Sequence, residues 1–300
     1  SRRPGLASSV VLILPNESLM PTRTSGMAHR RSAVIEVGGG QPSARIRRGA
    51  LAGIPSMRIH TEEVRISSAD AVLAGTLVAP PDPWPCVILV SGSGANDRDE
   101  TVCGHAPFRV IADYLVARGY AVLRCDDRGV GGSSGDADAQ DFDGSVADVV
   151  AMCRWLAAHP AVDATCLILV GHSEGGLVAA AAGPEVGAQA VVTLAGPSVP
   201  IEWLLHEQAR AVSAESGATA AQIEHERRMN ERVFALARSD RDRSVVDREI
   251  EDVIRIHLRS WPDAPEWDER TVDDTARLMA SVVSAPAYRS LLRQEPAAIL

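Results

Sequence analysis

From Met57 onward, apolar residues recur in short runs separated by polar and glycine-rich stretches. The apolar positions between 64 and 78 flank a polar stretch at 67–70, which predicts a β-hairpin. Residues 86–90 (C-V-I-L-V) are continuously apolar, as in a parallel-sheet strand covered on both faces. Apolar residues at helical spacing over 108–115 predict a helix that Gly119 ends. The same criteria predict strands over 120–125, 165–170 and 190–194, and helices over 146–157 and 174–183.

This alternation of strands and helices predicts an α/β core over residues 57–200, with a mostly parallel, doubly wound sheet behind an antiparallel hairpin. After Pro200 the chain is charged and shows helical patterns without a strand candidate. We expect a helical cap over 201–285, with a solvated helical extension as the alternative, and the start of a return to the core over 286–300. Residues 1–56 lack this patterning and are expected to form a disordered leader.

The stretch V-G-H-S-E-G-G over 170–176 places Ser173 between Gly171 and Gly175, directly after a predicted strand and before a predicted helix. A serine on such a corner is a nucleophile elbow, whose strained backbone projects Oγ above the carboxyl edge of the sheet. Ser133 fits the same G-x-S-x-G pattern but lies inside a loop, well before its helix. A tight structural turn is the alternative for Ser173, and its context favours the nucleophile.

An oxyanion hole needs two backbone N–H groups aimed at the developing charge. The residue after the nucleophile, Glu174, supplies one of them at the start of the predicted helix. The loop after the strand at 86–90 reads S-G-S-G, and we expect Ser93, or else Gly94, to supply the second. The alternative for this loop is a plain Gly/Ser turn.

Composition limits the classes of binding partner and the cellular location that we expect for this protein. The formal net charge of −9 gives no support to a nucleic-acid-binding surface. No apolar run approaches the ~20 residues of a membrane span, so no membrane partner is expected. The five cysteines include no C-x-x-C pair and fall mostly in predicted strands and helices. This pattern indicates reduced thiols in a cytoplasmic protein without a metal site.

Three stretches together resemble bacterial α/β-hydrolase carboxylesterases, near the serine aminopeptidase-like and dienelactone hydrolase-like groups. They are S-G-S-G-A-N-D-R-D-E (91–100), the region from Gly104 to Gly135, and G-H-S-E-G-G-L (171–177). The resemblance implies an eight-stranded α/β-hydrolase sheet, a serine nucleophile, a small-molecule ester or acyl substrate and no cofactor. It also implies that Asp126, Asp127 and Arg128 form a structural loop that shapes the edge of the pocket.

In these esterases the catalytic acid and histidine follow the seventh and eighth strands, after the cap. Here the chain ends in A-Y-R-S-L-L-R-Q-E-P-A-A-I-L, which resembles the segment before the seventh strand. We therefore expect a truncated copy that lacks both groups, leaves its last strand as an unpaired edge and is nearly inactive alone. His206, His225 and His257 are expected to be solvated or cap histidines, whereas His172 and His105 can line the pocket.

The expected function is hydrolysis of carboxylic esters through an acyl-enzyme at Ser173. Peptidase, thioesterase and acyltransferase chemistry would use the same elbow and oxyanion hole, so these activities are alternatives. A non-catalytic truncated fragment that binds ligands or partners without turnover is the alternative outside enzymology.

Overall fold

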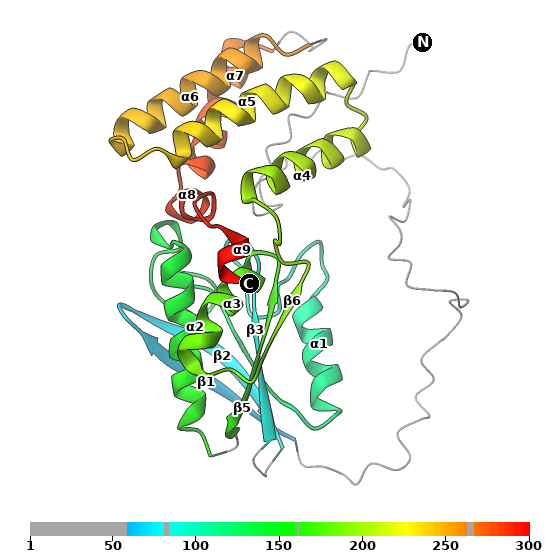
Figure 1. The fold of residues 1–300 in the computed structure, drawn as a ribbon, viewed down its shortest axis with the longest axis vertical. Coiled ribbons are helices and arrows are strands. Elements are labelled where there is room, and N and C mark those ends of the chain that lie inside the picture. Colours follow the sequence, from blue (N-terminus) through cyan, green and yellow to red (C-terminus); the bar gives the residue numbers. More distant parts are fainter. Residues whose placement is uncertain (1–58, 81–83, 161, 263–266) are drawn as a thin grey trace, which may run out of the picture.

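Six strands form one sheet in the computed structural model of the chain, which describes residues 59–80, 84–160, 162–262 and 267–300 (Figure 1). Their order across the sheet is β1-β2-β4-β3-β5-β6. The strands are β1 (His60–Ser68), β2 (Ala71–Ala79), β3 (Trp84–Val90), β4 (Ala121–Cys125), β5 (Val162–His172) and β6 (Ala190–Leu194). The leader predicted for residues 1–56 lies outside the described residues.

The sheet is antiparallel at one side and parallel elsewhere. β1, β2 and β4 are antiparallel neighbours, whereas β4, β3, β5 and β6 are parallel neighbours. Ser68 pairs with Ala71, so the hairpin turn is tighter than the polar stretch 67–70 suggested. β6 has β5 as its one neighbour among the described strands, and its Val191 and Val192 side chains are exposed. The predicted doubly wound, mostly parallel sheet behind a hairpin is confirmed.

Helices cover both faces of this sheet (Figure 1). Those of the sheet region are α1 (Pro107–Val116), the 3₁₀ turn η2 (Ala137–Ala139), α2 (Phe142–Ala157) and α3 (Glu174–Val186). Successive side chains of a strand point to opposite faces, so β3 contributes to two cores. Val87 and Leu89 pack in the cluster that includes Phe108 of α1, whereas Ile88 and Val90 belong to the cluster that includes α2 and α3.

Residues 201–262 and 267–291 are mostly helical and follow β6 through the linker 195–200; we call them the helical segment. Its helices are α4 (Ile201–Glu215), α5 (Ala220–Arg238), α6 (Arg243–Arg259), α7 (Glu269–Val283) and α8 (Pro286–Leu291), and a short α9 (Pro296–Ile299) comes after it. α5 begins at a capping box, in which the Thr219 hydroxyl and the Gln222 carboxamide each accept the other's backbone N–H. In the described part of the chain, no helix combines the length and the apolar character that crossing a membrane requires.

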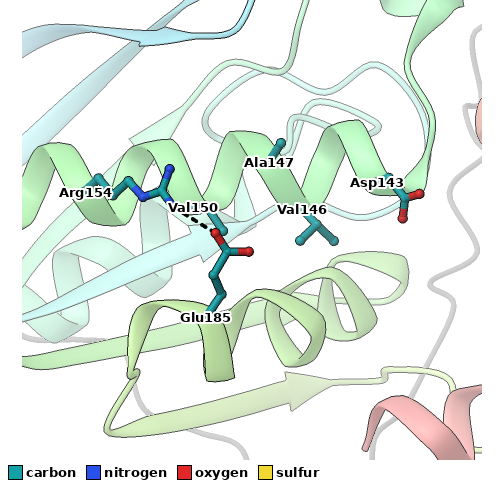
Figure 2. A pocket seen from close by; sticks show the side chains of 6 residues that line it. All are labelled: Asp143, Val146, Ala147, Val150, Arg154 and Glu185. Atoms are coloured by element: carbon teal, nitrogen blue, oxygen red, sulfur yellow. Dashed lines mark hydrogen bonds and ion pairs between the residues drawn. The ribbon is translucent and has the colours of Figure 1, made fainter.

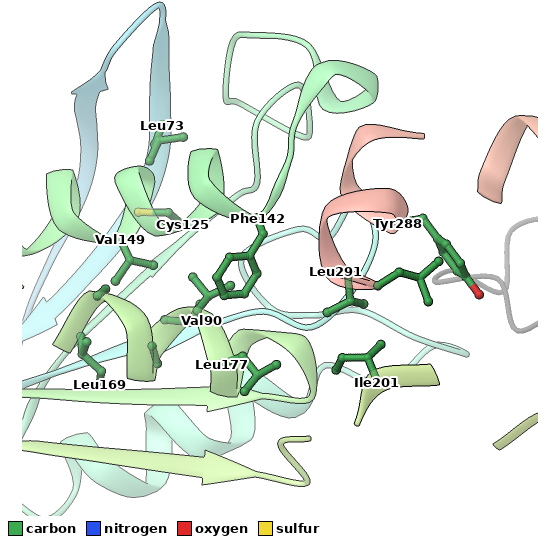
Figure 3. Packing of buried hydrophobic residues seen from close by; sticks show 14 of the residues in the cluster. Leu73, Val90, Cys125, Phe142, Val149, Leu169, Leu177, Ile201, Tyr288 and Leu291 are labelled. Atoms are coloured by element: carbon green, nitrogen blue, oxygen red, sulfur yellow. The ribbon is translucent and has the colours of Figure 1, made fainter. Parts of the chain in front are cut away.

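The helical segment shares one hydrophobic core with the sheet (Figure 3). Ile201 of α4 and Tyr288 and Leu291 of α8 belong to the same buried cluster as Phe142 of α2. The N–H of Phe142 also donates a hydrogen bond to Oγ of Ser290, 2.9 Å away. The helical segment is therefore packed against the sheet. The domain boundaries expected from the sequence stay predictions.

Candidate active site

Ser173 lies at the junction of β5 and α3, in a backbone conformation that few non-glycine residues adopt. Its φ is 51° and its ψ is −123°. Neighbouring backbone holds it there: the Ser173 N–H donates to the Leu194 carbonyl of β6, and the Gly176 N–H donates to the Ser173 carbonyl, both at 2.9 Å. Strain of this kind persists only where the surrounding structure maintains it, and it concentrates at functional sites. The strand-to-helix corner expected from the sequence is present at Ser173.

Backbone contacts explain the two glycines around Ser173. A Cβ atom on Gly171 would lie far inside van der Waals contact with the Gly175 carbonyl oxygen. A Cβ atom on Gly175 would collide in the same way with the Ser91 carbonyl oxygen. Both obstacles are backbone atoms, which cannot rotate away as a flexible side chain can. The G-x-S-x-G spacing thus follows from the close approach of β5, α3 and the loop after β3.

The loop after β3, residues 91–100, lies against this corner. The Ser93 hydroxyl donates to Oε2 of Glu174, 2.5 Å away. The Gly92 N–H is occupied, because it donates to a carboxylate of the same loop at 2.8 Å. Among the described residues, no hydrogen bond uses the N–H of Ser93, Gly94 or Glu174. The structure therefore brings together the three residues expected to supply oxyanion donors.

A carboxylate joins the 91–100 loop to β5. Oε1 of Glu100 accepts the Gly92 N–H and lies 2.7 Å from Nδ1 of His172. This hydrogen bond raises the pKa of His172, against the lowering effect of burial. Glu100 is 8% exposed, whereas the His172 side chain is 45% exposed, so one face of the imidazole is open to solvent. Sequence reasoning missed Glu100, because no motif marks a residue whose partner lies 72 positions away.

Two carboxyl groups near the corner, those of Glu174 and Asp127, have raised pKa values because they are buried. Burial raises the pKa of Glu174, and the hydrogen bond from Ser93 opposes that shift. Burial raises the pKa of Asp127 to about 7, although this carboxyl group also accepts hydrogen bonds. Its Oδ1 accepts from the Ser91 hydroxyl at 2.6 Å, and its Oδ2 accepts from the Asn96 N–H at 2.8 Å. Asp127 therefore anchors both ends of the turn 91–96.

The neighbours of Asp127 fasten the loop between β4 and α2. Asp126 forms a two-point ion pair with Arg98, at 3.0 Å through Nε and 2.8 Å through Nη2. Arg128 pairs in the same two-point way with Asp148 of α2, at 3.0 and 2.8 Å. Paired guanidinium and carboxylate groups of this geometry fix a backbone segment. These contacts fit the structural loop that the resemblance implies for Asp126, Asp127 and Arg128.

Ser133, the second serine in a G-x-S-x-G pattern, has a hydroxyl group that is fully engaged with backbone. Its Oγ accepts from the Ala74 N–H of β2 and donates to the Asp126 carbonyl, both at 2.8 Å. The residue lies in a loop rather than at the start of a helix. Ser133 therefore has a structural role: it holds the loop after β4 against β2.

No hydrogen bond joins Ser173 to a histidine among the described residues. His105 is exposed in a turn, where its backbone pairs with that of Val102. His206 of α4 packs on Phe234, with 5.1 Å between the ring centroids. Its two ring nitrogens are buried without a hydrogen-bond partner in the part of the chain that the structure describes, and burial lowers its pKa.

His225 and His257 face each other between α5 and α6. Nε2 of His225 lies 2.9 Å from the His257 carbonyl oxygen and 3.2 Å from Nδ1 of His257. Burial lowers the pKa of His257, and the nearby His225 adds to that effect. Both residues belong to the contact between two helices, as expected of cap histidines.

Two surface hollows of the described residues lie away from the strand-to-helix corner. One, of about 220 Å³, lies between α2 and α3 and is spanned by the ion pair of Arg154 and Glu185 at 2.9 Å (Figure 2). The other, of about 570 Å³, lies between α5 and α6, with Leu236 and Ile256 among its lining residues. Neither hollow is lined by Ser173, so neither marks the site that the corner would use.

Comparison with known families is decisive for classification. Residues 105–258, just over half of the chain, match the family described as "Serine aminopeptidase, S33". The chain belongs to the S33 serine aminopeptidase family. The matched residues of this S33 chain include the Ser173 corner, the helices α4 and α5, and all of α6 except its last residue. Its fold is that of the α/β hydrolases, as the sheet order and the corner indicate.

Proteins similar to the S33 chain include esterases. Esterase EstD of Thermotoga maritima is 29% identical over 126 residues, which cover 42% of this chain and 30% of that protein. The Pyrococcus furiosus esterase Pf2001 has a TM-score of 0.44 at 23% identity, over 52% of this chain and 57% of that chain. Est1E of Butyrivibrio proteoclasticus, with ferulic acid bound, has a TM-score of 0.40 at 21% identity, over 47% and 56% of the two chains. The S33 chain thus spans less than two thirds of each of these proteins.

Proposed function

We propose that this chain is a serine hydrolase that cleaves carboxylic esters through an acyl-enzyme at Ser173. The observation that carries the proposal is the strained Ser173 backbone at the start of α3, beside N–H groups that no hydrogen bond among the described residues uses. Oγ of Ser173 attacks the ester carbonyl, whose oxygen becomes an oxyanion facing the N–H groups of Glu174 and Ser93. The alcohol then leaves, and water releases the carboxylic acid. Gly94 is the alternative to Ser93 as the second donor.

Two observations favour esters over the other acyl substrates. The curated relative EstD is an esterase, although the family takes its name from aminopeptidases. An amide must also have its leaving amine protonated, a task that histidine performs in serine peptidases. No hydrogen bond joins Ser173 to a histidine among the described residues, whereas an activated ester needs less help from an acid. Thioesterase and acyltransferase chemistry differ only in the leaving group or in the acceptor of the acyl group.

We expect the reaction at Ser173 to be slow in this chain. Without a base in contact, the serine hydroxyl is a weak nucleophile. The oxyanion hole and substrate binding alone supply about 10³–10⁴-fold acceleration over water. A fragment that binds ligands without turnover is the competing proposal, and it predicts that no acyl-enzyme forms at all.

The state of the cysteines supports a reducing compartment, and we include a cytoplasmic location in the proposal. None of the five cysteines forms a disulfide. Burial raises the pKa of Cys86, Cys125 and Cys153 to about 12 each, so these thiols are protonated and unreactive. Free, buried thiols are typical of proteins that are kept in a reducing environment.

The proposal is tested with a fluorophosphonate, which forms a covalent adduct with an activated serine. After long incubation, intact-mass measurement and peptide mapping should locate the adduct on Ser173 in the wild type. The Ser173→Ala variant should form none, and Ser133 should stay unmodified because its hydroxyl is engaged. Equal labelling of the wild type and of Ser173→Ala would refute the assignment of the nucleophile.

The substrate class is tested with p-nitrophenyl esters of graded acyl length, compared with aminoacyl p-nitroanilides. A burst of nitrophenol equal to the protein concentration would identify the acyl-enzyme. We expect release from short to medium esters and none from the anilides. Faster release from the anilides would move the assignment to a peptidase.

A further inference from the structure

One carboxamide contacts three successive carbonyl groups of the 91–100 loop. Nδ2 of Asn96 lies 3.0 Å from the carbonyl oxygen of Gly92, 3.4 Å from that of Ser93 and 3.2 Å from that of Gly94. Only the NH₂ end of the side chain can make these contacts, since the oxygen end would place four acceptors together. The Asn96 side chain therefore draws the three carbonyl groups toward itself.

The direction of these carbonyl groups fixes the direction of the N–H groups. In a trans peptide the C=O of one residue and the N–H of the next point to opposite sides. The peptide with the Gly92 carbonyl carries the Ser93 N–H, and the peptide with the Ser93 carbonyl carries the Gly94 N–H. Both N–H groups consequently point away from Asn96. Gly94 permits the turn because its φ is +97°, in the region that favours glycine.

Asn96 is itself held in place by Asp127. The Asn96 N–H donates to Oδ2 of Asp127 at 2.8 Å, and its carbonyl accepts the Asp127 N–H at 3.0 Å. The Ser91 hydroxyl donates to Oδ1 of the same carboxylate at 2.6 Å. Both ends of the turn thus rest on one carboxylate, so the carboxamide of Asn96 acts from a fixed position.

We propose that Asn96 is the positioning residue of the oxyanion hole, turning the Ser93 and Gly94 N–H groups outward by holding the carbonyl oxygens of Gly92, Ser93 and Gly94. This inference rests on the proposed function, in which one of those N–H groups receives the oxyanion. Asn96 touches neither substrate nor nucleophile in this arrangement. Its effect reaches the reaction through the orientation of two peptide groups, and it should be felt only where negative charge develops on the carbonyl oxygen.

Kinetics of the full chain with p-nitrophenyl acetate, together with the rate of fluorophosphonate labelling, test this inference. Loss of one oxyanion-hole donor lowers kcat by about 10²–10³-fold, and we expect Asn96→Ala to lower it by about 10–100-fold with KM unchanged. Asn96→Asp keeps the shape of the side chain but presents oxygen atoms to the three carbonyl groups. It should therefore be no more active than Asn96→Ala. Thr101→Ala is the matched control, because Thr101 is exposed in the same region and only its backbone N–H is bonded.

A crystal structure of Asn96→Ala provides a measurement that does not depend on activity. We expect the peptide between Gly92 and Ser93, or the next one, to change its orientation in the variant. If the wild type hydrolyses the ester and Asn96→Ala keeps its kcat within twofold, the inference is overturned and the proposed function stands. If the wild type neither hydrolyses the ester nor reacts with the fluorophosphonate, the proposed function fails. If the peptide groups of Asn96→Ala keep the wild-type orientation in the crystal, the inference about Asn96 is overturned. A variant that does not fold is replaced by Asn96→Asp in both measurements, and full activity of that variant would contradict the inference.

Discussion

Oε1 of Glu100 lies 2.7 Å from Nδ1 of His172, and this hydrogen bond raises the pKa of the imidazole. A raised folded-state pKa stabilises the fold below the ordinary histidine pKa of about 6.5, and the stabilisation is lost as pH rises through the folded-state pKa. In Glu100→Gln the pKa of His172 should fall toward its usual value. The loss of unfolding free energy should be only about 1 kcal/mol near pH 5.5, because the His172 side chain is 45% exposed and solvent screens the pair. It should be smaller near pH 8.5, where more of the imidazole is neutral.

NMR titration of the histidine ring signals and urea unfolding at the two pH values measure these effects. His60 of β1 provides an internal control, since it is exposed and lies 40 positions before Glu100 in the chain. An equal loss of stability at both pH values would contradict the charge-dependent part of the prediction.

Gly175→Ala should destabilise the fold and abolish labelling of Ser173. The new Cβ would press on the Ser91 carbonyl oxygen, so the corner and the 91–100 loop must separate. Overpacking of this kind costs about 1–3 kcal/mol or more, measured by urea unfolding. Gly144→Ala is the matched control, since its Cβ would meet only the flexible side chains of Gln140 and Asp141. That variant should keep its labelling and stay within about 1 kcal/mol of the wild type; if Gly175→Ala did the same, the steric explanation of the motif would be wrong.

Ser133→Ala should lower stability and leave Ser173 reactive. The substitution removes the acceptor of the Ala74 N–H in β2 and the donor to the Asp126 carbonyl. A backbone donor left without a partner costs about 1–3 kcal/mol. Thermal unfolding and fluorophosphonate labelling distinguish the two serines. Loss of labelling at unchanged stability would mean that Ser133 takes part in the chemistry.

The stability of Glu226→Gln relative to the wild type should be greater at alkaline pH than at acid pH. Glu226 of α5 is 2% exposed and accepts one hydrogen bond, from the Ser213 hydroxyl of α4 at 2.6 Å. Burial raises its pKa to about 7 from a usual 4.5, so the folded state holds the proton more tightly than the unfolded state. The unfolding free energy of the wild type therefore falls as pH rises from about 4.5 to about 7, by about 3 kcal/mol in total.

The difference in unfolding free energy between Glu226→Gln and the wild type should increase by about this 3 kcal/mol between pH 4.5 and pH 8. Urea unfolding over this pH range measures it. Glu231→Gln, on the same helix and half-exposed, is the control and should show no such pH dependence. A pH-independent difference for Glu226→Gln would show that the pKa of Glu226 is the same in the folded and the unfolded state.

The strand-to-helix corner could be predicted from sequence because the residues that mark it are close together in the chain. Gly171, Ser173 and Gly175 lie within one turn, and the adjoining apolar runs indicate what comes before and after them. The same local context distinguished Ser173 from Ser133 as the candidate nucleophile. The hydrogen bonds of Ser133 to Ala74 and Asp126 give that second serine a structural role in its loop.

The groups that support the corner could not be predicted in this way. Glu100 and His172 are 72 positions apart, and Ser93 and Glu174 are 81 positions apart. Each pair forms only when β3 and β5 lie side by side, which the pattern of one strand does not encode. Burial of Glu226 escapes prediction for the same reason, since α5 is charged along its length and this carboxyl group is buried where α5 packs on other helices, beside Ser213 of α4.

The helical segment is fastened to the sheet at both of its ends, through the linker 195–200 and through α8, where Ser290 accepts the Phe142 N–H. Ile201 and Leu291 lie close to these two attachments, and both are buried in the core that the segment shares with the sheet. A segment joined in this way has no free end, so displacing α4 to α7 from the sheet must break buried contacts at one attachment or the other.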